Sequence, residues 1–150
     1  MDIIAYTKLK YDFANWPESP LMKSNEIIWK DRIPANFTLS AYEEHAFRNS
    51  AYRKVYVHQT NPQMRVEINS ITLPSFEDAK EYLVQQLARC ERELKRNDGL
   101  LRNCDLTFIS GETILGALIF IRNDTFVRMS SIGECDIDLS KLQIIDFGFL

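Results

Sequence analysis

The stretch Leu118-Ile-Phe-Ile-Arg-Asn-Asp-Thr-Phe-Val-Arg-Met129 decides the fold, because it predicts two strands joined by a tight turn. With Asn123 and Asp124 as the turn residues, Arg122 lies opposite Thr125 and the pairing continues outward. Alternate residues of a strand point to opposite faces of a sheet. One face of this hairpin then carries Leu118, Phe120, Val127 and Met129, and the other carries Ile119, Ile121 and Phe126 beside Arg128.

Both faces of the hairpin are largely apolar, and this property indicates its place in the fold. An antiparallel strand with one wet face is polar on that side, so we expect the hairpin in the middle of a sheet, with a layer of chain on each face. A partner or ligand covering the second face is the alternative, since contiguous exposed apolar patches mark interaction sites. A turn longer than two residues would shift the pairing and regroup the faces.

The clearest helix signal in the chain spans residues 76–96. Ser75 can cap the first turn, and Asn97-Asp-Gly99 can end the helix. Lys95 and Arg96 complement the negative end of the helix dipole. The apolar residues recur at intervals of three and four, and they form one stripe that should cover one face of the sheet: Phe76, Ala79, Leu83, Leu87, Cys90 and Leu94.

Other alternating runs predict further strands. Residues 53–58 and 64–69 read as a half-buried hairpin, while residues 106–109, 114–122 and 125–131 read as a meander. The order of strands, one long helix and further strands indicates an α+β fold. We expect a central antiparallel sheet in which consecutive strands pair.

The N-terminal residues 1–51 differ from the rest, because they carry three of the prolines and both tryptophans. Proline is excluded from central strands, so we expect strands and irregular chain wrapped over the second face of the sheet, together with residues 142–150. Ser40 followed by Glu43 predicts a short helix within this segment. The length of 150 residues favours a single domain, with residues 52–150 as its hairpin, helix and meander core.

The composition argues against several classes of protein. The chain has 18 basic and 21 acidic residues, a net charge of −3 and no basic cluster, so we expect no nucleic-acid binding. The apolar run of residues 114–121 is shorter than the roughly 20 residues of a membrane-spanning helix, so we expect no transmembrane segment. The first residues lack a secretory signal, which indicates a cytoplasmic protein as written, or an exported one if a signal has been removed.

Residues capable of chemistry are few and scattered, so we expect no catalytic residue, no metal site and no cofactor. His45 and His58 lie in no recognisable motif, and the three cysteines lack the spacing of a zinc site or a disulfide framework. Cys90 and Cys104 could be bridged in an exported chain. An enzyme that uses His58, or the carboxylates of residues 134–138 with a hard cation, is one functional hypothesis.

Two further sets of residues are candidate binding sites. Arg128 falls among apolar neighbours, so it either forms a structural salt bridge or marks a site for an anion or an acidic partner. If a protein partner covers the second face, its surface consists of Arg122, Arg128, Ile119, Ile121 and Phe126. A cavity between helix and sheet would suit a small molecule, with the lining residues Leu83, Leu87, Phe120 and Val127.

Three pieces of the chain resemble a loose group of uncharacterised bacterial exported domains. These pieces are Phe76-Glu-Asp-Ala-Lys-Glu-Tyr-Leu83, the hairpin from Leu118 to Arg128 with its Phe-x-Arg-Asn-x-x-x-Val pattern, and Ser130-Ser-Ile-Gly133, and the similarity spans residues 66–133. The resemblance implies a sheet packed on a helix, similar to PsbP-like or cystatin-like folds, and a place in the cell envelope. It implies no activity and no catalytic residue.

The function expected from these observations is a non-catalytic module that binds a protein partner, as an inhibitor, an immunity protein or an envelope accessory protein does. The sequence shows no nucleophile with an adjacent base and no complete phosphate loop. A small-molecule-binding domain with a pocket between helix and sheet is the alternative.

Overall fold

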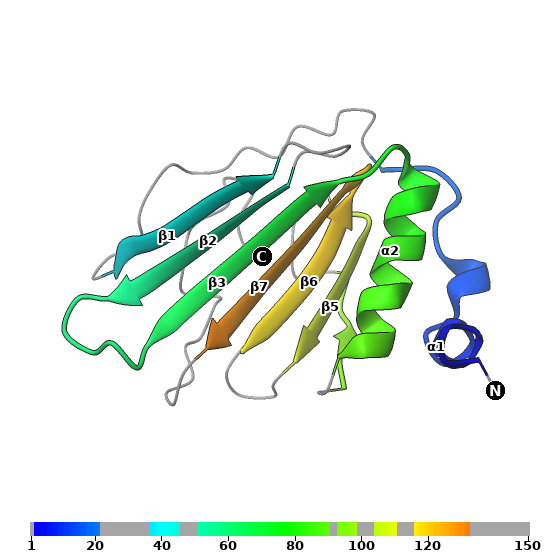
Figure 1. The fold of residues 1–150 in the computed structure, drawn as a ribbon. Coiled ribbons are helices and arrows are strands. Elements are labelled where there is room, and N and C mark those ends of the chain that lie inside the picture. The colour runs from blue at the N-terminus through cyan, green and yellow to red at the C-terminus, as the bar shows by residue number, and fades with distance from the viewer. Residues whose placement is uncertain are drawn as a thin grey trace.

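The structure is a computed structural model, and it describes residues 2–21, 37–45, 51–90, 93–98, 104–110 and 116–132, without the side chains of 37–45 and 132. Within these residues, seven strands form one antiparallel sheet in the order β1-β2-β3-β7-β6-β5-β4 (Figure 1). Helices α1 and α2 complete the α+β fold that the sequence predicts. The bounds are α1 Ile3–Lys10, β1 Phe37–His45, β2 Ala51–His58, β3 Arg65–Thr72, α2 Phe76–Arg89, β4 Lys95–Arg96, β5 Leu106–Ser110, β6 Ala117–Arg122 and β7 Thr125–Ile132, with a 3-10 turn at Phe13–Asn15.

The hairpin formed by β6 and β7 has the predicted turn and pairing. Arg122 lies opposite Thr125, and the register continues outward to Leu118 opposite Met129. Asn123 adopts a positive φ of 52°, a left-handed conformation that asparagine tolerates better than most residues. On their other sides β7 pairs with β3 and β6 pairs with β5, so both strands of the hairpin lie in the interior of the sheet.

Both faces of the hairpin are buried, as its apolar pattern predicts. Ile119, Ile121 and Phe126 are at most 3% exposed and belong to one cluster with the apolar stripe of α2, so we call this side of the sheet the helix face. The residues of the opposite face are 0% exposed: Leu118, Phe120, Val127 and Met129. Residues 142–150, which the sequence analysis expects over one face, lie outside the described part of the chain.

Helix α2 begins where the sequence predicts and ends earlier. Ser75 Oγ accepts a hydrogen bond from Asp78 N at 3.1 Å, so the predicted cap is present. The helix ends at Arg89 and Cys90 is extended, whereas the sequence pattern predicts a helix as far as residue 96. The reason is a tertiary contact, because residues 95–96 pair with β5 as the strand β4. Such pairing overrides a local helical preference of a few tenths of a kcal/mol per residue.

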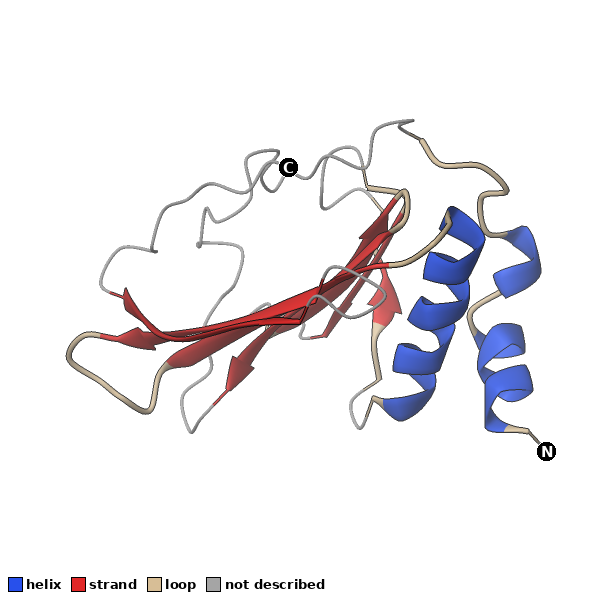
Figure 2. Ribbon diagram, turned by 45° about the horizontal axis from the view of Figure 1, so that its top comes forward, coloured by secondary structure: helices blue, strands red, loops and turns tan. Residues whose placement is uncertain are grey.

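Residues 2–21 lie on the same side of the sheet as α2, and not on the opposite face as the sequence analysis expects. Figure 2 shows α1 beside α2, and the two helices are in contact. Trp16 is 3% exposed, and its ring centre lies 5.7 Å from that of Phe108 on β5. The buried Lys80 of α2 donates a hydrogen bond from Nζ to the Pro17 carbonyl at 2.8 Å. The N-terminal residues therefore complete the apolar cluster of the helix face.

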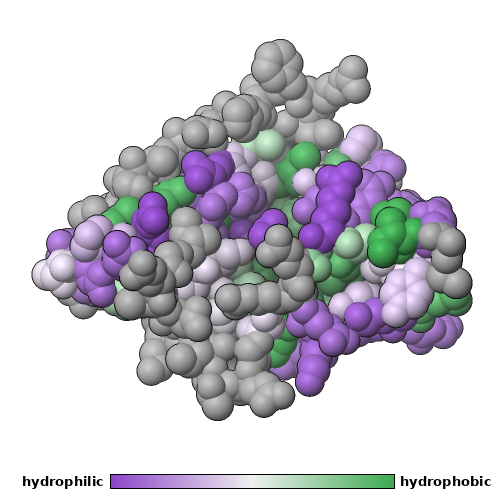
Figure 3. Space-filling model, turned by 60° about the horizontal axis from the view of Figure 1, so that its bottom comes forward, coloured by the Kyte–Doolittle hydropathy of each residue, from purple (hydrophilic) through white to green (hydrophobic). Residues whose placement is uncertain are grey.

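Two N-terminal elements differ from the sequence prediction. The sequence pattern does not predict α1, because its apolar residues form no buried stripe: Ile3, Tyr6 and Leu9 are 59%, 50% and 78% exposed. Figure 3 shows hydrophobic residues at the surface at the right-hand end, where α1 lies. Residues 37–45 form β1 instead of the short helix predicted from Ser40, because pairing with β2 outweighs a local capping preference.

The predicted hairpin of residues 53–58 and 64–69 is present as β2 and β3. The register of β3 with β7 aligns Ile68 with Met129, so Val66 and Ile68 lie on the opposite face, and both are buried. The alternate residues Glu67 and Asn69 lie on the helix face. Figure 1 shows α2 toward the β5 side of the sheet, so the polar helix face of β3 continues beyond the helix.

A buried carboxylate forms a hydrogen bond with the turn of the central hairpin. Asp105 is 7% exposed and directly precedes β5. Its Oδ2 accepts a hydrogen bond from Asn123 N at 2.7 Å, and its Oδ1 accepts one from Leu21 N at 2.5 Å. One side chain therefore links the hairpin turn to the N-terminal segment.

Candidate functional site

The structure buries most of the residues that the sequence analysis assigns to a partner surface. Ile119, Ile121 and Phe126 pack beneath α2, and Arg122 is 8% exposed at the end of β6. A hydrophobic face that packs against the chain's own helix is not open to a partner. Arg128 is the one member of the set that is exposed.

The four residues predicted to line a small-molecule pocket do not share one cavity. Leu83 and Leu87 belong to the cluster of the helix face. Phe120 and Val127 alternate with Ile119 and Phe126 along their strands, so they point to the opposite face. The sheet therefore separates the two pairs. The predicted pocket is wrong because both faces are largely apolar, and the helix covers the one that carries Arg128.

A different hollow lies between the C-terminal half of α2 and strands β6 and β7. Its volume is about 380 Å³, within the usual range for ligand sites. Two buried residues, Leu94 and Ile119, supply apolar lining. The polar lining comes from Gln86 and Arg89 of α2 and from Arg128, Ser130 and Ser131 of β7. The described lining residues include no Asp or Glu, so the charge that they give to this hollow is positive.

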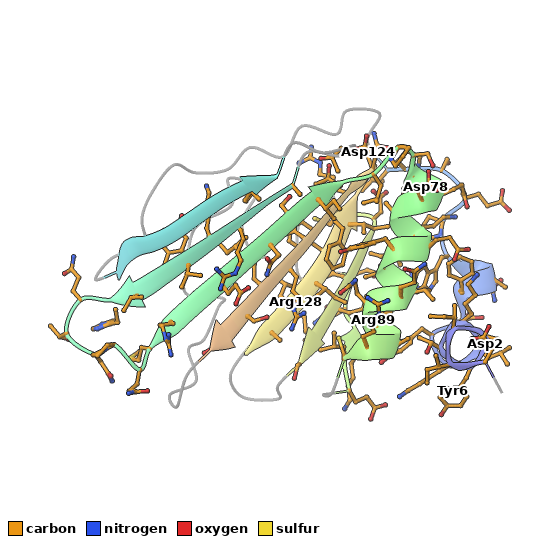
Figure 4. All side chains as sticks on the ribbon, in the orientation of Figure 1. Asp2, Tyr6, Asp78, Arg89, Asp124 and Arg128 are labelled. Carbon is orange, nitrogen blue, oxygen red and sulfur yellow. The ribbon has the colours of Figure 1, made fainter. Side chains whose placement is uncertain are left out.

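Arg89 and Arg128 face this hollow from opposite walls, and Figure 4 shows them on α2 and on the adjacent part of β7. Both side chains belong to exposed residues. Arg128 Nε lies 3.4 Å from Ser130 Oγ, a long hydrogen bond. Neither arginine forms an ion pair with another described residue, so the structural salt bridge predicted for Arg128 is not present among them. Within the described ranges, most donors of both guanidinium groups are not used in hydrogen bonds or ion pairs.

The carboxylate on the helix face of the neighbouring strand already has partners. Glu67 Oε1 accepts hydrogen bonds from Arg53 Nε at 2.8 Å and from Asn69 Nδ2 at 3.0 Å. Burial by itself raises the pKa of Glu67, but these hydrogen bonds and the charges of Arg53 and Arg128 outweigh it, so the pKa is lowered. Glu67 therefore stays ionised and is held by Arg53, while Arg128 lies outside ion-pair distance.

A second, smaller hollow lies further along the same side of α2. Its volume is about 180 Å³, and its lining includes Ile71 and Asn69 of β3, Tyr82 of α2 and Phe126 of β7. The rings of Tyr82 and Phe126 meet edge to face with their centres 4.9 Å apart. We call the two hollows together the α2 groove. One wall of the groove is the side of α2 that carries Tyr82, Gln86 and Arg89, at helical spacings of four and three.

The pH dependence of the Glu67 network gives a first prediction. Because the folded-state pKa is lowered, the carboxylate contributes stability above its unfolded-state pKa, and the contribution is lost as the pH falls through the folded-state pKa. Replacing Glu67 with glutamine should lower the free energy of unfolding at neutral pH by about 0.5 to 1 kcal/mol, as for other partly exposed ion pairs. Urea unfolding at neutral and acidic pH measures this difference, which should shrink in acid.

A matched control for this prediction is the exposed Glu18. Glu18→Gln should change the free energy of unfolding by less than about 0.5 kcal/mol at either pH. If Glu67→Gln and wild type differed equally at neutral and acidic pH, the bonds to Glu67 would not carry the effect.

The other candidate residues are His58, Cys90 and Cys104, and their contacts are typical of structural residues. His58 Nδ1 lies 3.3 Å from Thr60 N and 3.2 Å from Asn61 N, so it accepts hydrogen bonds within the β2–β3 turn. Cys90 and Cys104 are free thiols, and burial raises the pKa of Cys104 to about 12. Burial also raises the pKa of Cys90. Buried thiols of this kind are poor nucleophiles.

The remaining predictions concern metals and membranes. No group of three or more His, Cys, Asp or Glu suited to a metal lies in the described ranges, and residues 134–138 fall outside them. Within the same ranges no helix has the length and apolarity to cross a bilayer. The side chain of His45 is not described.

Comparison with known proteins found no matching family model, no matching curated protein and no matching solved structure. The resemblance to exported domains with PsbP-like or cystatin-like sheets therefore gains no support from these comparisons. Arg89 was not predicted as a site residue, because a charged residue on the outer side of a helix is ordinarily solvated. Arg89 differs from other exposed helix residues only because the sheet places β7, with Arg128, beside α2.

Proposed function

We propose that this chain is a non-catalytic protein-binding module whose α2 groove holds an acidic segment of a partner protein. The observation that supports the proposal is the pair Arg89 and Arg128, which line one hollow from two elements and have no carboxylate of the described residues within ion-pair distance. Guanidinium groups bind carboxylates through two parallel hydrogen bonds, and such charge-assisted bonds are roughly twice as strong as neutral ones.

Electrostatics favours an acidic occupant. Two like charges that line one hollow repel each other, and the repulsion falls with distance. A carboxylate between Arg89 and Arg128 would offset such repulsion. Glu67, on the neighbouring strand, pairs with Arg53 at 2.8 Å and acts on Arg128 only from beyond ion-pair distance.

The surroundings of the two arginines favour a protein over a smaller ligand. Both arginines are exposed, while Leu94 and Ile119 beside them are buried. Arginine over an apolar floor is typical of the residues that carry binding energy in protein interfaces. The 380 Å³ hollow also lies in the range of small-ligand sites, so a small organic carboxylate is the second candidate.

Selection of a displayed random-peptide library on the wild-type protein tests the proposal. The selected peptides should be rich in Asp and Glu, and fluorescence anisotropy should give their dissociation constants. Arg89→Glu or Arg128→Glu should weaken binding by about tenfold or more, which corresponds to about 1.4 kcal/mol. The loss should diminish at high salt, because salt screens exposed charges.

Lys95→Glu is the matched control, because Lys95 is exposed on β4 and the substitution changes the net charge equally. It should alter binding by less than about twofold if the groove itself is the site. Equal losses for Lys95→Glu and Arg128→Glu would reduce the effect to net charge and contradict the proposal. Saturable binding of octanoate in preference to every acidic peptide would favour the second candidate.

A further inference from the structure

The two hollows of the α2 groove follow each other in the same order along β7 and along α2. On β7, Phe126 lines the smaller hollow and Arg128 lines the larger one. On α2, Tyr82 lines the smaller hollow, and Gln86 and Arg89 line the larger one. A recess that carries the aromatic rings of Tyr82 and Phe126 and a recess that carries Arg89 and Arg128 therefore follow each other along a single strand and along a single side of a helix.

The spacing of the two recesses is set by the strand. Phe126 and Arg128 are two residues apart and share the helix face, so their side chains are separated by about 6.7 Å along β7. An extended peptide that runs along the groove has the same repeat, since its residues i and i+2 point the same way. We propose that the partner segment is extended and carries an apolar residue two positions from an Asp or Glu. This inference rests on the proposed function.

Each recess fits one half of such a pair. The smaller hollow, of about 180 Å³, is lined by Ile71, Tyr82 and Phe126 and also by Arg53, whose charge is paired with Glu67. Its apolar side chains suit one aliphatic side chain of a peptide. The larger hollow supplies the guanidinium groups of Arg89 and Arg128 for the carboxylate. The apolar side chain of the peptide contributes buried apolar area, and its carboxylate fixes the orientation of the peptide. Other sites that bind extended peptides likewise have pockets for alternate side chains.

Polar side chains along the groove favour an extended segment over a helical one. Asn69, Gln86 and Ser130 line the two hollows and carry amide or hydroxyl groups. An extended peptide has free backbone N–H and C=O groups that need such partners. The backbone of a helix already satisfies its own groups apart from its ends, so it would leave these side chains without a peptide partner.

Labelled peptides of equal composition test the spacing. Each contains one leucine and one glutamate in a Gly-Ser background, with the leucine one, two, three or four positions from the glutamate. Fluorescence anisotropy should show the two-position peptide binding about tenfold more tightly than the one-position peptide. The peptides with three or four positions, which match a helix repeat, should also bind more weakly. Tightest binding by any of these three would overturn the inference.

A variant that fills the smaller hollow provides an independent test. Ala51 lines that hollow, and Ala51→Phe should occupy it without removing a contact. The two-position peptide should then bind no more tightly than a matched peptide with glycine in place of leucine, whereas wild type should distinguish the two by about tenfold. Circular dichroism and thermal melting establish that the variant is folded. An undiminished preference for leucine in folded Ala51→Phe would overturn the inference.

The two proposals fail in different ways. If acidic peptides bind and the binding depends on Arg89 and Arg128 but not on spacing, the proposed function stands and the extended-segment inference is wrong. If no acidic peptide binds in a manner that depends on these arginines, the proposed function fails, and the inference fails with it.

Discussion

Replacing Trp16 with alanine should lower the free energy of unfolding by about 3 to 5 kcal/mol, the usual cost of truncating a buried aromatic residue. Trp16 is 3% exposed and packs its ring against Phe13 and Phe108, with ring centres 5.0 Å and 5.7 Å away. Its Nε1 also donates a hydrogen bond to the Tyr11 carbonyl at 2.8 Å. Urea unfolding followed by far-ultraviolet circular dichroism measures the loss.

The control for this prediction comes from the same N-terminal segment. Leu9 is 78% exposed, so Leu9→Ala should change the free energy of unfolding by less than about 0.5 kcal/mol. A Trp16→Ala protein that is as stable as Leu9→Ala would mean that the N-terminal residues do not dock on β5. It would also mean that α1 is not part of the core that supports the α2 groove.

Replacing Asp105 with alanine should cost about 1 to 3 kcal/mol, because it removes two hydrogen bonds to a carboxylate while the freed N–H groups are only partly buried and water can reach them. The two groups affected are the backbone N–H groups of Leu21 and Asn123. Asp105→Asn keeps one acceptor oxygen and should lose roughly half as much. Equilibrium urea unfolding of both variants provides the comparison.

Asp98 serves as the control for Asp105. Its side chain is 44% exposed, pairs with Arg96 on the short strand β4, and accepts one further hydrogen bond, a long one of 3.5 Å from Thr107 N. Asp98→Ala should therefore cost less than about 1 kcal/mol, the usual limit for an exposed ion pair. If Asp105→Ala lowered the free energy of unfolding no more than Asp98→Ala does, the hydrogen bonds of Asp105 would not stabilise the hairpin turn.

The central hairpin was predictable from the sequence because two independent signals coincide there. Asn123-Asp124 marks the turn, and apolar residues on both sides of each strand require an interior position. Helix α2 was predictable at its start, where Ser75 caps it. These features depend on neighbouring residues alone, and the structure confirms them.

The features that the sequence did not predict depend on contacts between distant residues. The end of α2 depends on the pairing of residues 95–96 with β5. Helix α2 could cover either of two largely apolar faces of the hairpin, and Trp16 packs on the same face as α2. The groove depends on the pairing of β3 with β7, which aligns Asn69 with Arg128. No local pattern encodes these pairings.

The strand order also has a consequence for how the chain folds. β6 and β7 are separated by the two residues of one turn, whereas β3 and β7 become neighbours only after the chain between them has been enclosed as a long loop. Closing a long loop carries a greater entropic cost than closing a short one. We therefore expect the hairpin to form early on the folding pathway and β3 to join late. Substitutions at Asn123 should then slow refolding, while substitutions at Ile68 should mainly accelerate unfolding.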